Sequence, residues 1–184
     1  MKFTKSELLE EIKKNFLGEV NSDIKTLDTY SRDASLLEVK PELVLFPKNT
    51  DDIKNLVKLV SENKKDNPSL SITPRAAGTC MSGGPLSESI VIDMTKHFGG
   101  ILSVSSEEAT VLPGTFYRDF ETETLKHNAM LPSYTASKML NTVGGMVANN
   151  SAGEKTLSYG KTEKYVKELT CVIVTGKQIG RAHV

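Results

Sequence analysis

The sequence has no tryptophan, only two cysteines and no excess of charge of either sign. Lys and Arg together number 23, as do Asp and Glu, so the basic surface typical of nucleic-acid-binding proteins is missing. Cys80 and Cys171 lie far apart, which argues against a disulfide framework and fits a reducing cytoplasm, the location that we expect. No stretch is long and apolar enough for a transmembrane helix, and acidic residues near the N-terminus argue against a signal peptide.

The chain does contain enough apolar sequence for a folded domain. Its 184 residues are 38% hydrophobic and 25% charged, which supports a packed core and argues against disorder. The length fits one domain, or one domain with a short leader. The histidines His97, His127 and His183 lack the spacing of metal ligands, so we expect no metal site.

Apolar periodicity predicts helices and short strands along the chain. Thr4-Lys5-Ser6-Glu7 fits a capping box at the start of an amphipathic helix over Thr4–Leu17, which Gly18 would end. Further helices are predicted after Asn49 or Thr50 and over Phe116–Lys126, and strands over Leu43–Phe46, Leu70–Thr73, Ser89–Asp93, Ile101–Val104, Ala109–Leu112 and Lys167–Thr175, the last with Cys171 buried in the core. This order predicts an α+β fold in which helices cover a small mixed sheet.

The most informative stretch follows the strand predicted at Leu70–Thr73. It reads Pro74-Arg75-Ala76-Ala77-Gly78-Thr79-Cys80-Met81-Ser82-Gly83-Gly84, and nearly all of its side chains are small. Such a chain can bring successive backbone N–H groups close to a phosphate, and its glycines allow the positive φ angles that an anion-binding nest requires. It matches neither G-x-x-x-x-G-K-[ST] nor G-x-G-x-x-G, and a plain surface turn is the alternative interpretation.

A second stretch of small residues lies later in the chain. It reads Asn141-Thr142-Val143-Gly144-Gly145-Met146-Val147-Ala148-Asn149-Asn150-Ser151-Ala152-Gly153 and again leaves the backbone open to a close neighbour. Taken alone, it could be a tight corner between a helix and a strand. Two such stretches in one domain favour a single ligand with two ends, and a dinucleotide is a ligand of that kind.

The order of these motifs resembles a known family. Pro41-Glu42-Leu43-Val44, Phe46-Pro47, the two small-residue stretches, Leu112-Pro113-Gly114, Pro132-Ser133 and Tyr159-Gly160 resemble the FAD-binding domain of the vanillyl-alcohol oxidase and para-cresol methylhydroxylase (PCMH) superfamily. Within it, the sequence is most similar to the D-lactate dehydrogenase and glycolate oxidase D-subunit branch, including the lead-in Tyr30-Ser31-Arg32-Asp33-Ala34-Ser35. No single motif is specific, but their shared order is.

The resemblance implies a two-subdomain, PCMH-type FAD-binding fold with FAD in the cleft between the subdomains. The first loop would line the FAD pyrophosphate, mostly through backbone N–H groups, with Arg75, Ala76, Ala77, Gly78, Thr79, Cys80, Met81, Ser82 and Gly83. Pro132 and Ser133 would lie near the ribityl or flavin end. Thr142, Gly144, Gly145, Asn149, Asn150, Ala152 and Gly153 would wrap the other side, and Gly160 would close it.

The resemblance also implies a chemistry. Some relatives attach FAD through a histidine in the first loop; this loop has none, so we expect non-covalent FAD, with a Cys80 thioether as a weaker alternative. The activity implied is oxidation of a D-2-hydroxy acid, lactate- or glycolate-like, by hydride transfer to FAD, with an unidentified electron acceptor. Catalytic residues would lie downstream, so none is nominated here.

The domain boundaries follow from the same resemblance. We expect a leader helix in residues 1–29 and the FAD-binding domain in 30–178, with subdomains of about 30–95 and 96–178, the second incomplete. Residues 179–184 resemble the translation of a sequencing adapter, so native sequence is expected to end near Lys177 or Gln178 and to leave a strand with an unpaired edge. Two other functions stay open: a FAD-binding or electron-transfer subunit without catalysis, and a phosphate-binding protein without a redox role.

Overall fold

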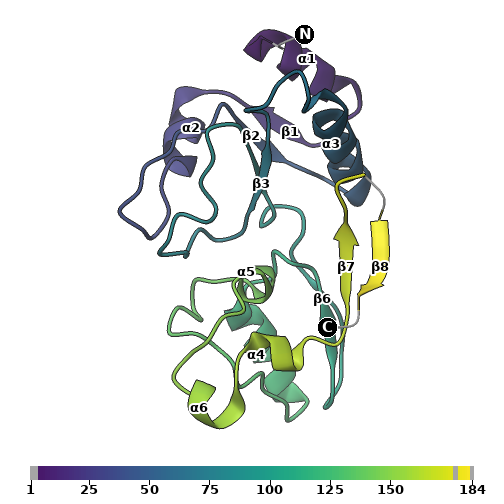
Figure 1. Cartoon of the computed structure of the whole chain (residues 1–184). Coiled ribbons are helices and arrows are strands. Elements are labelled where there is room, and N and C mark those ends of the chain that lie inside the picture. The colour runs from purple at the N-terminus through teal and green to yellow at the C-terminus, as the bar shows by residue number, and fades with distance from the viewer. Residues whose placement is uncertain (1–3, 176–177, 183–184) are drawn as a thin grey trace.

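The computed structural model describes residues 4–175 and 178–182, which form an α+β arrangement of two units (Figure 1). The first unit spans residues 5–93 and the second spans residues 101–165, and an antiparallel strand pair of residues 169–172 and 178–182 lies beside them. The expected native end at Lys177, and His183 and Val184 of the expected tail, lie outside the described residues. Among the described residues, no helix has the length and apolar character needed to cross a membrane.

A mixed sheet organises the first unit. Its strands are β1 (Glu19–Asn21), β2 (Leu43–Phe46), β3 (Ile72–Arg75) and β4 (Ile90–Asp93), in the spatial order β1-β2-β4-β3. β1 pairs antiparallel with β2, whereas β2, β4 and β3 run parallel, with both Leu43 and Ile72 opposite Ile90. All residues of β2 and β4 are buried, because helices cover both faces, and this is why these strands read as continuous apolar runs. The predicted mixed sheet is confirmed.

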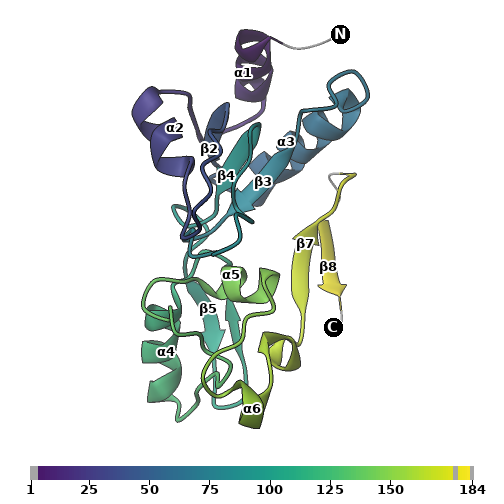
Figure 2. The same ribbon diagram turned by 60° about the vertical axis from the view of Figure 1, so that its left-hand side comes forward.

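Alternate residues of β2 face two different helix layers. Leu43 and Leu45 belong to one core cluster with residues of α1 (Lys5–Lys14) and α3 (Thr50–Asn63), whereas Val44 and Phe46 pack with Leu27 of α2 (Ile24–Tyr30). Figure 2 shows the sheet between α2 and α3. The residues expected to be a separate leader therefore share the core of the sheet, and they contain a strand and a helix, β1 and α2, that the sequence pattern did not reveal.

The first helix begins as predicted but ends early. The Thr4 side chain accepts a hydrogen bond from the Glu7 backbone N–H (3.2 Å) and Glu7 reaches back to the Thr4 N–H (2.8 Å), which is the predicted capping box. The helix ends at Lys14, with Asn15 as its C-cap, so the expected end at Gly18 is wrong. Gly18 serves another purpose: a Cβ there would overlap the carbonyl oxygen of Phe46, so its small size lets the chain enter the sheet beside β2.

A buried carboxylate joins the start of α3 to the segment that follows α1. Asp52 is 1% exposed; its Oδ1 accepts from Leu17 N (2.7 Å) and its Oδ2 from Lys48 N (2.8 Å). Its own N–H donates to Oδ1 of Asn49, the helix N-cap (3.0 Å). One buried side chain therefore satisfies two backbone donors that no strand or helix pairs.

We expect Asp52→Asn to lower the free energy of unfolding by about 2 kcal/mol, the usual scale for a buried hydrogen bond to a charged group. The amide offers one acceptor oxygen, so its NH₂ would face one of the two backbone donors of Leu17 and Lys48. Urea unfolding measures the effect. Asp51→Asn is the matched control, since the Asp51 side chain is 77% exposed and pairs only at the surface with Lys54. Equal stability of the two variants would contradict the prediction.

The second unit has its own small core. It contains β5 (Ile101–Val104), β6 (Ala109–Val111), α4 (Tyr117–Lys126), α5 (Val143–Ala148), α6 (Thr156–Tyr159) and a 3-10 helix, η1 (Thr162–Tyr165). Tyr117, Phe120 and Met146 form its buried cluster. β5 and β6 pair antiparallel around a Ser/Glu turn, as predicted. The helix predicted over Phe116–Lys126 begins one residue later, at Tyr117, with Phe116 as its N-cap.

The late strand is shorter than expected and more exposed. β7 (Leu169–Val172) pairs antiparallel with β8 (Gln178–Ala182), so the edge expected to be unpaired has a partner on one side. Cys171 is exposed, and its prediction as a buried core residue is wrong. A two-stranded ribbon has no second layer over each face, so an apolar run in the sequence does not ensure burial there.

Candidate functional site

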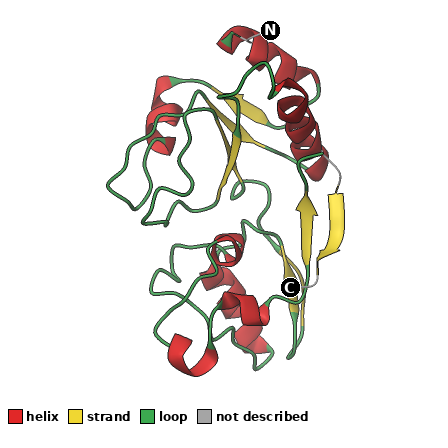
Figure 3. Ribbon diagram, in the orientation of Figure 1, coloured by secondary structure: helices red, strands yellow, loops and turns green. Residues whose placement is uncertain are grey.

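The predicted first loop leaves the sheet at the end of β3. Arg75, the last residue of β3, lies opposite Asp93 at the end of the parallel strand β4, so the loop starts where two carboxyl ends meet. Figure 3 shows the connection from β3 to β4 as continuous loop. Within it, φ is positive at Gly78 (+68°) and Gly83 (+78°). These are the backbone conformations that an anion-binding nest needs, and residues other than glycine rarely adopt them.

The side chain of Arg75 is occupied by the protein itself. Its Nη1 donates to the carbonyl of Tyr30 (3.3 Å) and its Nη2 to the carbonyl of Arg32 (2.8 Å), while its Cζ lies 5.0 Å from the centroid of the Tyr30 ring. The Tyr30 hydroxyl donates to Oδ2 of Asp93 (2.7 Å), and burial together with this hydrogen bond raises the pKa of Tyr30. Burial also lowers the pKa of the Arg75 guanidinium, which stays charged. Nη1 and Nη2 of Arg75 are therefore used to hold the segment that contains Tyr30 and Arg32.

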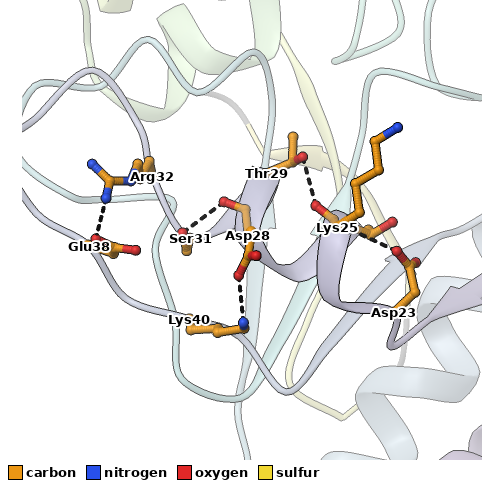
Figure 4. A network of polar contacts seen from close by, with 9 residues as sticks. Asp23, Lys25, Asp28, Thr29, Ser31, Arg32, Glu38 and Lys40 are labelled. Atoms are coloured by element: carbon orange, nitrogen blue, oxygen red, sulfur yellow. Dashed lines mark hydrogen bonds and ion pairs between the residues drawn. The ribbon is translucent and has the colours of Figure 1, made fainter.

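The lead-in segment continues after α2 to about residue 40, and polar contacts close it into a hairpin-like loop. Val39 N donates to the carbonyl of Ser31 (2.9 Å), and Arg32 forms a bridge with Glu38. Figure 4 shows the side chains that hold this hairpin-like loop closed: ion pairs join Arg32 to Glu38 and Asp28 to Lys40, and the Ser31 hydroxyl donates to the carbonyl of Asp28 (2.8 Å).

This lead-in lies against the first loop. Ala34 N donates to the carbonyl of Gly78 (3.1 Å), and a Cβ on Gly83 would lie 2.6 Å from Cδ1 of Leu37. Leu37 and Met81 are nevertheless largely exposed, at 53% and 82%. Both positive-φ glycines of the loop thus lie next to one neighbouring segment.

Cys80 lies within the loop and has an altered acidity. Its Sγ is 3.2 Å from the hydroxyl of Ser82. This side-chain hydrogen bond, with a weaker one from the Ser82 backbone, lowers the pKa of the Cys80 thiol from its usual value. The thiol is partly exposed, and a lower pKa increases the fraction of the reactive thiolate.

The second small-residue stretch begins as a helix that contacts the first loop. Thr142, 1% exposed, is the N-cap of α5 and accepts from Gly145 N (3.2 Å). Gly144 N donates to the carbonyl of Pro113 (2.9 Å), and a Cβ on Gly144 would lie 2.5 Å from Cβ of Pro113. A Cβ on Gly145 would lie 3.6 Å from Cβ of Ala76. The structure therefore brings the two stretches together at Ala76 and Gly145.

The rest of this stretch turns back against the segment that follows α4. A Cβ on Gly153 would overlap the carbonyl oxygen of Tyr134, so the two chains touch through their backbones. Tyr134 also donates from its hydroxyl to Oε1 of Glu154 (2.6 Å), and this hydrogen bond raises the pKa of Tyr134. Ser133 is fully buried beside Thr162, whose hydroxyl donates to the Ser133 hydroxyl (3.4 Å).

The remaining predicted residues lie around this corner. Asn150 has positive φ (+44°), donates from Nδ2 to Oε2 of Glu163 (2.6 Å) and accepts from the Glu163 N–H (3.0 Å). Gly160 ends α6 with φ +83° and a Cβ there would meet the Lys164 side chain. Asn149 and Ala152 are exposed. Ser133 thus lies beside the second stretch, because its neighbour Thr162 also donates from its N–H to the carbonyl of Ser151 (3.1 Å). The first loop meets this stretch at Gly145.

The resulting site is made of backbone more than of functional side chains. Gly78, Gly83 and Gly160 have positive φ, and Gly144 and Gly153 are too close to a neighbour to carry a Cβ. Thr142, Ser133 and Arg75 use their side chains to support the fold. Among the described residues, no group of His, Cys, Asp and Glu is arranged to hold a metal ion. These features define the class: an α+β domain with a glycine-rich, backbone-lined corner, a kind of surface that suits phosphate groups.

Comparison with known protein families identifies the family to which the chain belongs. A family model described as an FAD binding domain matches residues 41–180, and the chain belongs to this family. It is 28% identical over 176 residues to D-2-hydroxyglutarate dehydrogenase of Pseudomonas putida, covering 94% of this chain and 17% of that protein. It is 32% identical over 151 residues to glycolate oxidase subunit GlcD of Bacillus subtilis, covering 80% of this chain and 31% of that protein. The chain thus spans less than a third of the length of these relatives.

Solved structures share the fold. An alkyldihydroxyacetonephosphate synthase superposes with a TM-score of 0.81 and 21% identity, over 99% of this chain and 35% of that one. 6-Hydroxy-D-nicotine oxidase of Arthrobacter nicotinovorans gives a TM-score of 0.73 and 21% identity, over 89% of this chain and 35% of that one. The predicted PCMH-type α+β fold and the resemblance to D-lactate dehydrogenase and glycolate oxidase are confirmed.

Proposed function

We propose that this chain is the FAD-binding portion of a longer oxidoreductase that oxidises a D-2-hydroxy acid. The observation that carries the proposal is the contact of two backbone-lined stretches at Ala76 and Gly145, in a chain that belongs to an FAD-binding family. Matched relatives bear the names D-2-hydroxyglutarate dehydrogenase, D-lactate dehydrogenase and glycolate oxidase subunit, which supports a hydroxy acid as the substrate class.

The residues present fit FAD as a ligand. Gly78 and Gly83 have the positive φ that lets neighbouring N–H groups face one anion, so the loop over Arg75–Gly83 would hold the pyrophosphate. Pro132, beside the buried Ser133, would lie toward the ribityl or flavin end, and Thr142, Gly144, Gly145, Asn149, Asn150, Ala152, Gly153 and Gly160 would form the other wall. FAD would occupy the cleft between subdomains of about 30–95 and 96–178.

When bound, FAD would supply the redox chemistry by accepting a hydride equivalent from the substrate carbon. The residues described here would bind and orient it, and the base and the substrate-binding residues would come from further sequence, as would the contacts to an electron acceptor. We place the protein in the cytoplasm, propose that FAD is held without a covalent bond, and propose that residues 179–184 are not native.

The test is expression of the whole gene product and measurement of its visible absorbance. A yellow protein whose flavin bleaches anaerobically on adding D-lactate, D-2-hydroxyglutarate or glycolate would support the proposal. Flavin that bleaches with none of them would favour an electron-transfer subunit, and a colourless protein that still binds ADP would favour a phosphate-binding role. Acid precipitation should release the flavin into the supernatant; flavin that stays with the protein would overturn the non-covalent assignment.

The rate at which Cys80 is alkylated tests whether FAD covers the first loop. We expect FAD to slow alkylation of Cys80 by iodoacetamide and to leave Cys171, which is exposed on β7, unaffected. At an FAD concentration about 100 times Kd, about 1% of sites are free, so the slowing can reach about 100-fold. Mass spectrometry of the two cysteine peptides gives both rates in one sample. Equal rates at Cys80 with and without bound FAD would remove the first loop from the binding site.

A further inference from the structure

We propose that Arg75 is a positioning residue: its guanidinium fixes the lead-in segment against the first loop and so presets the backbone that receives FAD. Its positive charge would attract phosphate, but both Nη1 and Nη2 donate to backbone carbonyls of the lead-in. Nη1 and Nη2 are engaged by the carbonyls of Tyr30 and Arg32, at 3.3 and 2.8 Å. The inference deepens the proposed function, since the ligand is the FAD proposed above.

Two contacts transmit this position to the loop. The lead-in that Arg75 holds at Tyr30 and Arg32 continues to Ala34, whose N–H donates to the carbonyl of Gly78 (3.1 Å). The guanidinium also lies directly behind Gly78, where an added Cβ would be 2.5 Å from Nη2. Arg75 therefore contacts the loop once through space at Gly78 and once through the lead-in, and both contacts end at the residue with φ +68°.

The other groups around Arg75 hold its guanidinium in this place. The Tyr30 ring lies beneath it at 5.0 Å, and the Tyr30 hydroxyl is tied to Asp93 at the end of β4 (2.7 Å). Asp93 in turn accepts from the N–H of Thr95 through Oδ1 (2.7 Å). The planar fork of arginine can donate to two carbonyls and stack on a ring at once, which lysine cannot reproduce.

The test compares Arg75→Lys with Arg75→Met in the whole gene product. A residue that acts by charge on the phosphate would tolerate lysine and lose affinity with methionine. A residue that acts by the two-carbonyl fork would lose affinity with both, and we expect FAD to bind at least about tenfold more weakly in each variant. Arg32→Lys is the control: only the backbone carbonyl of Arg32 is used, and its exposed side chain pairs with Glu38.

A second readout needs no FAD. In the protein stripped of flavin, hydrogen exchange at the Ala34 amide should become at least about tenfold faster in both Arg75 variants, because local opening of the lead-in becomes easier. Amides of β4 should keep their protection, which shows that the sheet is intact. If methionine prevents folding, the milder lysine variant decides the question.

The outcomes separate the inference from the proposed function. Loss of FAD affinity in both variants with faster exchange at Ala34 supports the positioning role. Near-normal affinity in Arg75→Lys, or unchanged exchange at Ala34 in the variants, overturns it. If the unmodified protein fails to bind FAD, the proposed function falls, and exchange at Ala34 still decides whether Arg75 positions the loop.

Discussion

Replacing Gly78 with valine is expected to abolish FAD binding in a protein whose sheet remains folded. Gly78 has φ +68°, a conformation that β-branched residues adopt at a cost of about 1–3 kcal/mol or more. A Cβ would lie 2.5 Å from Nη2 and 2.9 Å from Cζ of Arg75. An arginine can often move away from such a clash, but this one is held by two carbonyls and the Tyr30 ring. The loop must therefore change its path.

The expected loss in FAD affinity is at least about 100-fold, the equivalent of ~2.7 kcal/mol, which is within the cost of the strained backbone plus the clash. Titration of the flavin-free protein with FAD, followed by quenching of flavin fluorescence, measures it. Gly78→Ala should fall between valine and the unmodified protein. Gly99→Ala is the control, because its Cβ would meet nothing nearer than 3.7 Å. Unchanged FAD binding in Gly78→Val would remove this loop from the proposed site.

The sheet and the small-residue stretches could be read from the sequence because their signals are local. Leu43–Phe46 and Ile90–Asp93 are continuous apolar runs, and two-sided burial produces such runs. β1 and α2 gave no such signal: Glu19–Asn21 is a three-residue edge strand, and α2 buries only Leu27. Their structure depends on β2 as a partner, which is information that lies outside their own sequence.

The side-chain supports of the site were also beyond local pattern. The fork of Arg75 joins residues 43 and 45 positions away in the chain, and the hydrogen bond between Tyr30 and Asp93 spans 63 positions. A sequence pattern can mark Arg75 as part of a glycine-rich loop, and it can mark Asp93 as a strand end. The direction of each side chain depends on how α2 packs on the sheet. Only the structure therefore shows that the Arg75 guanidinium lies behind Gly78 and contacts the lead-in.

Gly153→Ala is expected to destabilise the second unit itself, because the methyl group would meet backbone and not a side chain. A Cβ at this position would overlap the carbonyl oxygen of Tyr134 and lie 2.8 Å from its carbonyl carbon. Neither atom can turn away by changing a rotamer. The segment around Tyr134 would have to shift, and with it the Tyr134–Glu154 hydrogen bond and the buried Ser133. We expect a loss of about 3 kcal/mol or more, at the upper end for overpacking.

Hydrogen exchange shows which part of the second unit Gly153→Ala destabilises. A substitution at Gly145 separates an effect on folding from an effect on FAD binding. In Gly153→Ala, the amides of Tyr117 and Val143, which donate to Asn141 and Thr115, should lose protection, while those of β4 should keep it. In Gly145→Ala, the methyl group would lie 3.3 Å from Oγ1 of Thr142 and 3.6 Å from Cβ of Ala76, so the unit should stay folded. FAD affinity should nevertheless fall, because Gly145 is where the two stretches meet. Full stability of Gly153→Ala would show that the Tyr134 segment is free to move, and a wall of the proposed site built on that segment could not hold FAD in one position.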